Sequence, residues 1–372
     1  MNNFRLRIMY DYQMIVIQRF GGISRYFFDL ATAFSKQHKV ITPVLFPKSF
    51  YFESYFGKKS SRFALWRWNK PFVYPLNQLY NIIKLITYRP DILHITYYSS
   101  YLLSFIPNKT KLVVTAHDMI HEIYPELFPS WDFTTKHKRK VFCKADLIIA
   151  ISENTKNDLI KYFNLAPSKI TVIYHGNPFE KVLPESKFAM DSPYFLFVGQ
   201  RDKYKNFNVL IKAIVPILLE RKFKLLCVGG KPFSTEELTQ FEAMGVKSHV
   251  ERRTCSDTEL QSAYKNALCM IYPSKYEGFG IPILEAWASR CPLIISNASC
   301  FPEIAKNGAL YFEPENIEQL RTQIESLISS QQLRNTLVKR GQELLKQYTI
   351  EKTFTQTINA YYKAIATEAN PH

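Results

Sequence analysis

Short runs of consecutive apolar residues recur along the chain, separated by polar turns and by longer segments with helical spacing of apolar positions. A run of this kind is typical of a strand buried on both faces of a sheet. Such runs lie at 7–10, 40–46, 92–96, 112–115, 147–151 and 169–174, and again at 194–198, 224–229, 250–251, 268–272, 293–296 and 309–312. Because helical segments separate them, the pattern predicts an α/β protein with parallel sheets.

The alternation is interrupted by a turn, His175-Gly176-Asn177-Pro178, whose composition is typical of a hinge. We therefore predict two Rossmann-like domains, over residues 1–176 and 177–349. A chain of 372 residues is long enough for a sizeable core in each. Hydrophobic residues make up 47% of it, which excludes a disordered protein.

The most informative stretch is YPSKYEGFGIPILEAWASRCP, residues 272–292, which follows an apolar run. This stretch predicts a strand, a turn with two glycines and a helix opened by Pro282. Such an arrangement forms an anion site, because the N–H groups of the first helical turn have no partner inside the helix. Glu277 and Glu285 flank this turn, and carboxylates accept hydrogen bonds from hydroxyls. The combination favours a phosphate with hydroxyls at both ends, as in a nucleotide-sugar. The alternatives are a solvated charge at Glu277 and an acid favoured by the helix dipole at Glu285.

Three other turns follow predicted strands, where ligands of parallel sheets bind. Gly21 and Gly22 precede a helix predicted over 26–34, and His117 follows the run at 112–115. Arg201 and Lys205 follow the run at 194–198, and two cations there suit a diphosphate. A tight turn and a solvated basic loop are the alternatives. The remaining histidines of these segments, His94 and His121, we interpret as structural.

No G-x-G-x-x-G fingerprint follows the first strand, which disfavours an NAD-dependent oxidoreductase. The E-x7-E pattern with its internal GFGIP instead resembles the donor-binding motif of the family 4 retaining glycosyltransferases. GGISRY at 21–26, TAHDMIHEIYPELF at 115–128 and VGQRDKYKNF at 198–207 resemble segments of the same family. The first of these is similar to the branch that builds mannose- or rhamnose-containing bacterial polysaccharides.

The resemblance implies the GT-B fold, in which two Rossmann-like domains face each other across a cleft. It also implies that a C-terminal helix, within residues 350–372, returns toward the N-terminal domain. Arg290 stands where the family usually has glycine. Because a positive φ is costly for arginine, we expect the end of the preceding helix to differ. Residues 48–80 match no motif of the family.

The resemblance further implies how a donor would be held. Glu285 would bind the ribose hydroxyls and Glu277 the hydroxyls of the transferred sugar, which His117 would help to orient. The groups that would neutralise the departing diphosphate are Arg201, Lys205 and the backbone N–H groups of Phe279, Gly280 and Ile281. Such a site would need neither a metal ion nor another cofactor.

The net charge of +16 is concentrated in the first half of the chain. Residues 1–176 hold 24 Lys and Arg against 11 Asp and Glu, a net +13, whereas residues 177–372 hold 24 against 21, a net +3. Residues 50–74 combine many aromatics with basic residues, which predicts contact with an anionic membrane surface. A core helix with solvated charges and base stacking are the alternatives. The basic run KHKRK at 136–140 we interpret as a solvated helix face.

Six cysteines without a C-x-x-C pair, and an N-terminal apolar run broken by Asp11, favour a cytoplasmic protein with reduced thiols and no signal peptide. We therefore predict a metal-independent retaining hexosyltransferase, peripheral on the inner face of the cell membrane. Its donor would be a nucleotide diphosphate-sugar, GDP-mannose first, and its acceptor a lipid-linked saccharide of O-antigen or capsule synthesis. No nucleic acid is expected as a partner. The alternatives are a nucleotide-sugar 2-epimerase of the same fold and a basic nucleic-acid-binding protein.

Overall fold

The computed structural model describes residues 4–19, 21–55, 70–180, 188–201 and 203–366. The chain forms two compact units: unit 1 comprises residues 1–173 and 354–372, and unit 2 comprises residues 174–353. Each unit contains a six-stranded sheet whose strand pairs are all parallel. The predicted α/β class with two parallel sheets is confirmed.

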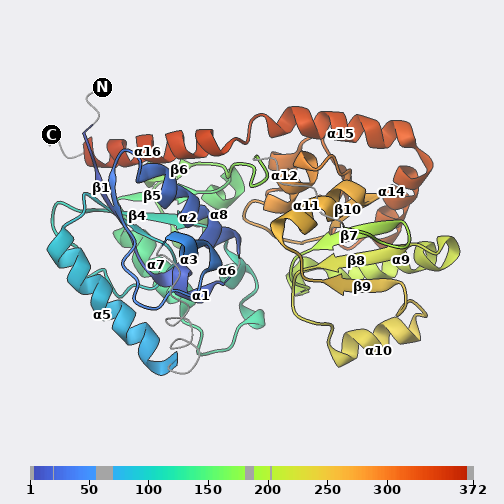
Figure 1. Ribbon diagram of the computed structural model, residues 1–372, viewed down its shortest axis with the longest axis horizontal. Helices are drawn as coiled ribbons and strands as arrows, with labels where there is room; N and C mark the ends of the chain where they lie inside the picture. The colour runs from blue at the N-terminus through green and yellow to red at the C-terminus, as the bar shows by residue number, and fades with distance from the viewer. Residues whose placement is uncertain (1–3, 20, 56–69, 181–187, 202, 367–372) are drawn as a thin grey trace. The chain divides into compact units, whose positions relative to one another are not determined.

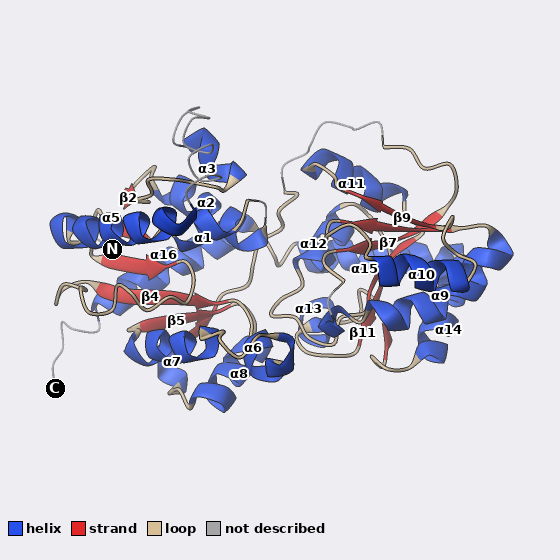
Figure 2. Ribbon diagram, turned by 90° about the horizontal axis from the view of Figure 1, so that it is seen from below, coloured by secondary structure: helices blue, strands red, loops and turns tan. Residues whose placement is uncertain are grey.

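In unit 1 the strand order is β2-β1-β3-β4-β5-β6, and Figure 1 labels β1, β4, β5 and β6 of this sheet. The strands are β1 (Arg7–Tyr10), β2 (Lys39–Ile41), β3 (Ile92–Ile95), β4 (Lys111–Ala116), β5 (Leu147–Ala150) and β6 (Ile170–Val172). The helices are α1 (Gln13–Ile17), α2 (Gly22–Phe34), α3 (Phe50–Tyr55), α5 (Lys70–Tyr88), α6 (Ile120–Ile123), α7 (Thr134–Lys144), α8 (Glu153–Phe163) and the part of α16 (Ile350–Ala366) from Phe354 onward. Helices α2 and α16 cover one face of the sheet, and α7 and α8 cover the other (Figure 2). Both faces of the central strands are therefore buried, which explains why β3, β4 and β5 are mostly apolar.

The last helix of the chain is fastened to the core of unit 1 by a buried polar network. The Tyr361 hydroxyl lies 3.2 Å from the Tyr10 hydroxyl and 2.6 Å from Nδ1 of His94. The other ring nitrogen of His94 lies 2.9 Å from the hydroxyl oxygen of Thr115. Burial lowers the pKa of His94 to about 3, so its ring is neutral. His94, interpreted from the sequence as structural, thus joins α16 to the middle of the sheet.

The strand predicted over 40–46 is wrong in its second half, because β2 ends at Ile41. Pro43 has no N–H to donate to a neighbouring strand. The backbone that follows bonds to α5 instead: the Leu45 N–H donates to Oδ1 of Asn77 at 2.8 Å, and the Pro43 carbonyl accepts from Nδ2 of Asn81 at 2.7 Å. Side chains from a distant helix therefore replace the sheet as partners of this segment.

Unit 2 has the strand order β12-β11-β10-β7-β8-β9. Its strands are β7 (Tyr194–Val198), β8 (Lys224–Val228), β9 (Val250–Arg253), β10 (Cys269–Tyr272), β11 (Leu293–Ser296) and β12 (Leu310–Phe312). Its helices are α9 (Phe207–Arg221), α10 (Thr235–Ala243), α11 (Asp257–Asn266), α12 (Ile281–Ala288), α13 (Phe301–Ala305), α14 (Ile317–Ser329) and α15 (Gln331–Leu345), with the first residues of α16. A core cluster of apolar residues joins α9 and α14 to β7, β8 and β10.

The expectation that Arg290 changes the end of α12 is wrong. Arg290 adopts a φ of +58°, the left-handed conformation that glycine usually supplies. Its N–H donates to the Trp287 carbonyl at 3.0 Å, and the next residue, Cys291, donates to the Ala286 carbonyl at 2.8 Å. These hydrogen bonds close the helix in the ordinary way and offset the cost of the strained φ.

Candidate functional site

Two predicted site residues meet where the strand order of unit 2 reverses. The chain runs from β7 outward to β8 and β9, then returns to place β10 on the other side of β7. Lys205 follows β7 and Glu277 follows β10, and Lys205 Nζ lies 2.5 Å from Oε1 of Glu277. Their side chains are only 13% and 12% exposed. Such a reversal point is where ligands of open parallel sheets bind, so the ion pair marks a candidate site.

The turn that carries Glu277 is held by Ser299, in the loop after β11. The Ser299 hydroxyl donates to the Glu277 carbonyl at 2.6 Å and accepts from the Glu277 N–H at 3.2 Å. Both backbone groups of Glu277 are thus bonded to one side chain. Ser299 itself has a φ of +55°, a conformation that costs energy in residues with a side chain. Sequence reasoning did not identify this residue, because one serine in a turn gives no signal of its partner.

Helix α12 begins directly after the glycine turn. Gly280 is its N-cap residue, with a φ of +88°, and the Ile283 N–H donates to the Gly280 carbonyl at 2.9 Å. The Phe279 ring is buried and meets the His175 ring edge-on at 5.2 Å. Burial lowers the pKa of His175 to about 4, so this imidazole is neutral. Phe279, Gly280 and Ile281, the first residue of the helix, thus form the turn that leads from Glu277 into α12.

Replacing Gly280 with alanine is expected to destabilise unit 2 by about 2 kcal/mol or more. A positive φ costs alanine about 1 kcal/mol. The new Cβ would also lie 3.0 Å from the ring of Phe301, which is fully buried and has little room to move. Gly245 is the matched control, because its φ is +69° but a Cβ there would meet nothing within 4 Å. Urea denaturation of both variants separates the cost of the positive φ from the cost of crowding against Phe301. Equal losses in the free energy of unfolding would contradict a contribution from crowding.

Glu285, in the middle of α12, is held by a tyrosine of the neighbouring helix α11. The Tyr264 hydroxyl donates to Oε2 of Glu285 at 2.8 Å. Burial and the nearby Glu285 carboxylate raise the pKa of Tyr264 well above its usual value, so the hydroxyl keeps its proton. Glu285 is itself only half-buried. Tyr264, which sequence reasoning missed, therefore orients this carboxylate.

Arg201, predicted to act together with Lys205, has a different partner. Its Nε and Nη2 bond to the carboxylate of Glu237 at 2.6 and 3.2 Å, and Nη2 also donates to the carbonyls of Lys231 and Pro232. Burial acts to raise the pKa of Glu237, but the hydrogen bonds from Arg201 and from the Ser234 N–H, together with the Arg201 charge, outweigh it and the pKa is lowered. The Arg201 side chain is 6% exposed, and its buried Nη1 has no hydrogen-bond partner among the described residues. Arg201 is therefore held by Glu237 and by the loop between β8 and α10.

Unit 1 brings the other predicted motifs together. His117 follows β4, and its N–H donates to the Tyr98 hydroxyl at 2.8 Å. Its ring lies edge-on to those of Tyr26 and Phe27 of α2, with centroids 6.2 and 6.0 Å away. Helix α2 starts at Gly22, with Gly21 as its N-cap residue. The glycine pair and the histidine therefore belong to one local structure.

The interpretation of residues 136–140 as a solvated face is wrong for Lys138, which is fully buried. Its Nζ lies 2.8 Å from Oε2 of Glu122 and 2.9 Å from the Asp118 carbonyl oxygen, and 4.9 Å from the centre of the Tyr98 ring. Burial acts to raise the pKa of Asp118, but the Lys138 charge and other contacts leave it lowered. Lys138 thus fastens the backbone next to His117. The helical spacing from Lys138 to the buried Val141 could have indicated this orientation.

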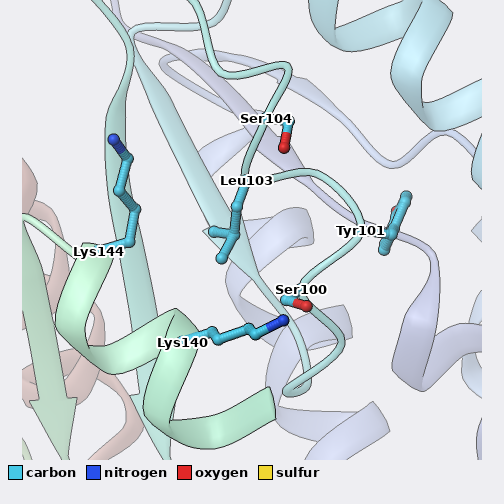
Figure 3. Close-up of a pocket in the computed structure, with 6 residues that line it drawn as sticks. All are labelled: Ser100, Tyr101, Leu103, Ser104, Lys140 and Lys144. Carbon is cyan, nitrogen blue, oxygen red and sulfur yellow. The ribbon is translucent and has the colours of Figure 1, made fainter. Parts of the chain in front are cut away.

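The pocket in Figure 3 lies elsewhere in unit 1, between α7 and the loop after β3. It has a volume of about 570 Å³ and is lined by Ser100, Tyr101, Leu103, Ser104, Lys140 and Lys144. Lys140 extends from α7 toward Ser100. None of the predicted site residues lines it.

Within the described ranges, no group of three His, Cys, Asp or Glu side chains could hold a metal ion. None of the helices built from these residues has the length and apolar character to cross a bilayer.

Family models match both parts of the chain. Residues 20–180 match "Glycosyltransferase Family 4", and residues 178–344 match "Glycosyl transferases group 1". An O-antigen chain mannosyltransferase B of Escherichia coli is 27% identical over 69% of this chain and 72% of its own length. The O-antigen chain mannosyltransferase RfbU of Salmonella typhimurium is 28% identical over 60% of this chain and 62% of its own length.

Solved structures of similar fold cover almost all of the chain. Sucrose-phosphate synthase of Thermosynechococcus elongatus has a TM-score of 0.75 at 17% identity, covering 98% of this chain and 100% of that one. Anabaena Alr3699/HepE, solved with UDP-glucose, has a TM-score of 0.71 at 18% identity, covering 96% of this chain and 100% of that one. At such identities the likeness establishes the fold.

Proposed function

The chain belongs to glycosyltransferase family 4, and we propose that it transfers mannose from GDP-mannose to a lipid-linked saccharide with retention of configuration. Two relatives named as O-antigen chain mannosyltransferases support this choice of sugar and of pathway class. The reaction belongs to the synthesis of a bacterial cell-surface polysaccharide. The enzyme works in the cytoplasm, at the inner face of the membrane that holds its acceptor.

The observation that carries the proposal is the ion pair of Lys205 and Glu277 beside the first turn of α12. A cation and a helix N-terminus together attract a diphosphate, because both present positive charge to it. A carboxylate in the same place binds no phosphate but accepts hydrogen bonds from sugar hydroxyls. A nucleotide diphosphate-sugar is the ligand that satisfies both groups at once.

In this proposal, different residues of unit 2 bind different parts of the donor. Glu285, oriented by Tyr264, accepts hydrogen bonds from the ribose hydroxyls. Lys205 and the N–H groups of Phe279, Gly280 and Ile281 oppose the charge that develops on the diphosphate as the glycosidic bond breaks, and Arg201 adds to them. Such stabilisation of developing charge lowers the transition-state barrier more than any other effect of these residues. Glu277 binds the hydroxyls of the mannose.

The chemical step needs no nucleophile from the protein. The acceptor hydroxyl attacks the anomeric carbon from the face that GDP leaves, so one carbon–oxygen bond forms as the other breaks. A diphosphate oxygen takes the hydroxyl proton, and GDP departs with it. His117 orients the mannose. Gly21 and Gly22 take part in binding the acceptor. Because Lys205 and the helix terminus neutralise the diphosphate, the reaction runs without a metal ion.

GDP is expected to raise the melting temperature of the protein more than UDP or ADP does, equally with and without a chelator. All nucleotides are added at the same saturating concentration, since the stabilisation increases with the ratio of nucleotide concentration to Kd. Glu285→Ala should remove the shift, whereas Glu236→Ala, an exposed acid on α10, should leave it unchanged. A larger shift with UDP would overturn GDP-mannose as the donor. No shift with any diphosphate would overturn the donor site itself.

A further inference from the structure

Helix α5 presents a continuous apolar stripe to solvent at the edge of unit 1 (Figure 1). Five large side chains repeat at alternating intervals of four and three residues, which places them on one side of a helix. They are Phe72, Leu76, Leu79, Ile83 and Ile86, and each is between 44% and 64% exposed. Scattered apolar residues on a surface are ordinary, but an aligned set of this size indicates a contact surface.

The opposite side of α5 is fixed by polar bonds, so the stripe cannot turn inward. Asn77 and Asn81 are fully buried. Asn77 donates to the Val73 carbonyl at 2.8 Å and accepts the Leu45 N–H at 2.8 Å, and Asn81 donates to the Pro43 carbonyl at 2.7 Å. The buried side of the helix therefore carries the two amides together with Val73 and Leu85, while the aliphatic side chains of the stripe lie outside. A helix with apolar side chains on its outer side as well fits one whose outer face meets a second apolar phase.

The part of the sequence that contains α5 is cationic. Between Glu53 and Asp91 the sequence contains seven Lys and Arg and no Asp or Glu. Unit 1 as a whole holds 25 Lys and Arg against 12 Asp and Glu, a net +13, whereas unit 2 holds 23 against 20, a net +3. On the described part of α5 itself, Lys84 Nζ lies 5.5 Å from the centre of the Tyr80 ring, and the exposed Arg89 follows the helix. An apolar stripe within a cationic surface is complementary to an anionic bilayer.

We propose that α5 is a membrane-docking helix, which lies in the headgroup layer of an anionic bilayer with its stripe among the acyl chains. This surface goes beyond the transfer reaction, and it moves the contact predicted for residues 50–74 to α5, which shares only residues 70–74 with that segment. Within that segment, residues 56–69 lie outside the described part of the chain, and Phe52 is buried in the core beside α5. Burial of the stripe supplies the apolar part of the binding free energy, and the charge of unit 1 supplies the part that weakens with salt.

The test is co-sedimentation of the full chain with vesicles of phosphatidylglycerol or of phosphatidylcholine. The wild-type protein should bind the anionic vesicles strongly, bind the neutral ones weakly, and release from the anionic ones as salt rises. Leu79→Gln and Ile83→Gln should each weaken binding about tenfold, because each removes one inserted aliphatic side chain. Leu219→Gln, at an exposed leucine on α9 of unit 2, is the matched control and should bind as the wild type does.

Two further measurements, the stabilisation by GDP and the oligomeric state, distinguish a membrane-docking surface from a damaged donor site and from a dimer interface. The stabilisation by GDP should be the same in all variants, so loss of vesicle binding with that shift intact supports the docking surface independently of the donor site. Undiminished vesicle binding by the double variant Leu79→Gln/Ile83→Gln would overturn the proposal. So would a wild-type protein that is a dimer in sedimentation velocity and becomes monomeric in the double variant, because the stripe would then be an interface between two copies.

Discussion

Glu277→Ala is expected to lower kcat for mannosyl transfer at least about a hundredfold while the protein stays folded. The substitution removes the carboxylate proposed to bind the sugar hydroxyls. It also leaves Lys205, 2.5 Å away in the wild type, without its partner in a site with little solvent. The transfer rate with radiolabelled donor measures the first effect, and the melting temperature shows that the fold survives.

Two further variants decide what Glu277 contributes. Glu277→Gln keeps an acceptor oxygen for a hydroxyl but loses the charge opposite Lys205, so its kcat should fall between the wild type and the alanine variant. Glu285→Gln should act mainly on KM for the donor, since its carboxylate is proposed to bind the ribose and not the reacting sugar. An unchanged kcat in Glu277→Ala would remove this residue from the mechanism, whatever the behaviour of Glu285.

Lys138→Met should destabilise unit 1 by about 3 kcal/mol or more, although the residue lies in a basic run that suggests a surface. Methionine fills most of the space but leaves the Glu122 carboxylate, 4% exposed, without the ammonium that now lies 2.8 Å away. A buried charge without its partner is among the costliest defects a substitution creates. Urea denaturation measures the loss.

The matched control for Lys138 stands on the same helix. Lys140→Met changes the same residue type at an exposed position and should alter stability by less than about 0.5 kcal/mol. In the double variant Lys138→Met/Glu122→Leu both charges are gone, so part of the lost stability should return. If Lys138→Met were as stable as Lys140→Met, the buried ion pair would have no role in holding the segment beside His117.

Much of the fold can be predicted from the sequence because most strands are buried on both faces. An apolar run such as that of β10 is then unambiguous, since no solvated face interrupts it. The end of β2 could not be predicted in this way. It depends on Asn77 and Asn81, more than thirty residues away, whose amides bond to the backbone after the strand. Contacts of this range leave no periodic signal.

The same distinction applies to the candidate site. Glu277, Gly280 and Glu285 lie within one strand–turn–helix segment, so their spacing alone indicates an anion site with flanking acids. The residues that orient them come from other elements: Ser299 follows β11, and Tyr264 lies on α11. The pairing of Glu237 with Arg201 is harder still to predict. Ser234-x-x-Glu237 forms a capping box, which explains the glutamate without any contact to Arg201.

The division of the chain into residues 174–353 and two flanking segments has a consequence for its biosynthesis. A ribosome finishes unit 2 while unit 1 still lacks the helix that carries Tyr361. Until residue 361 has been synthesised, Tyr10 and His94 of the nascent protein have no hydroxyl from that helix to bond with. A premature stop between residues 353 and 361 would therefore spare unit 2 and damage unit 1, most of which is synthesised first.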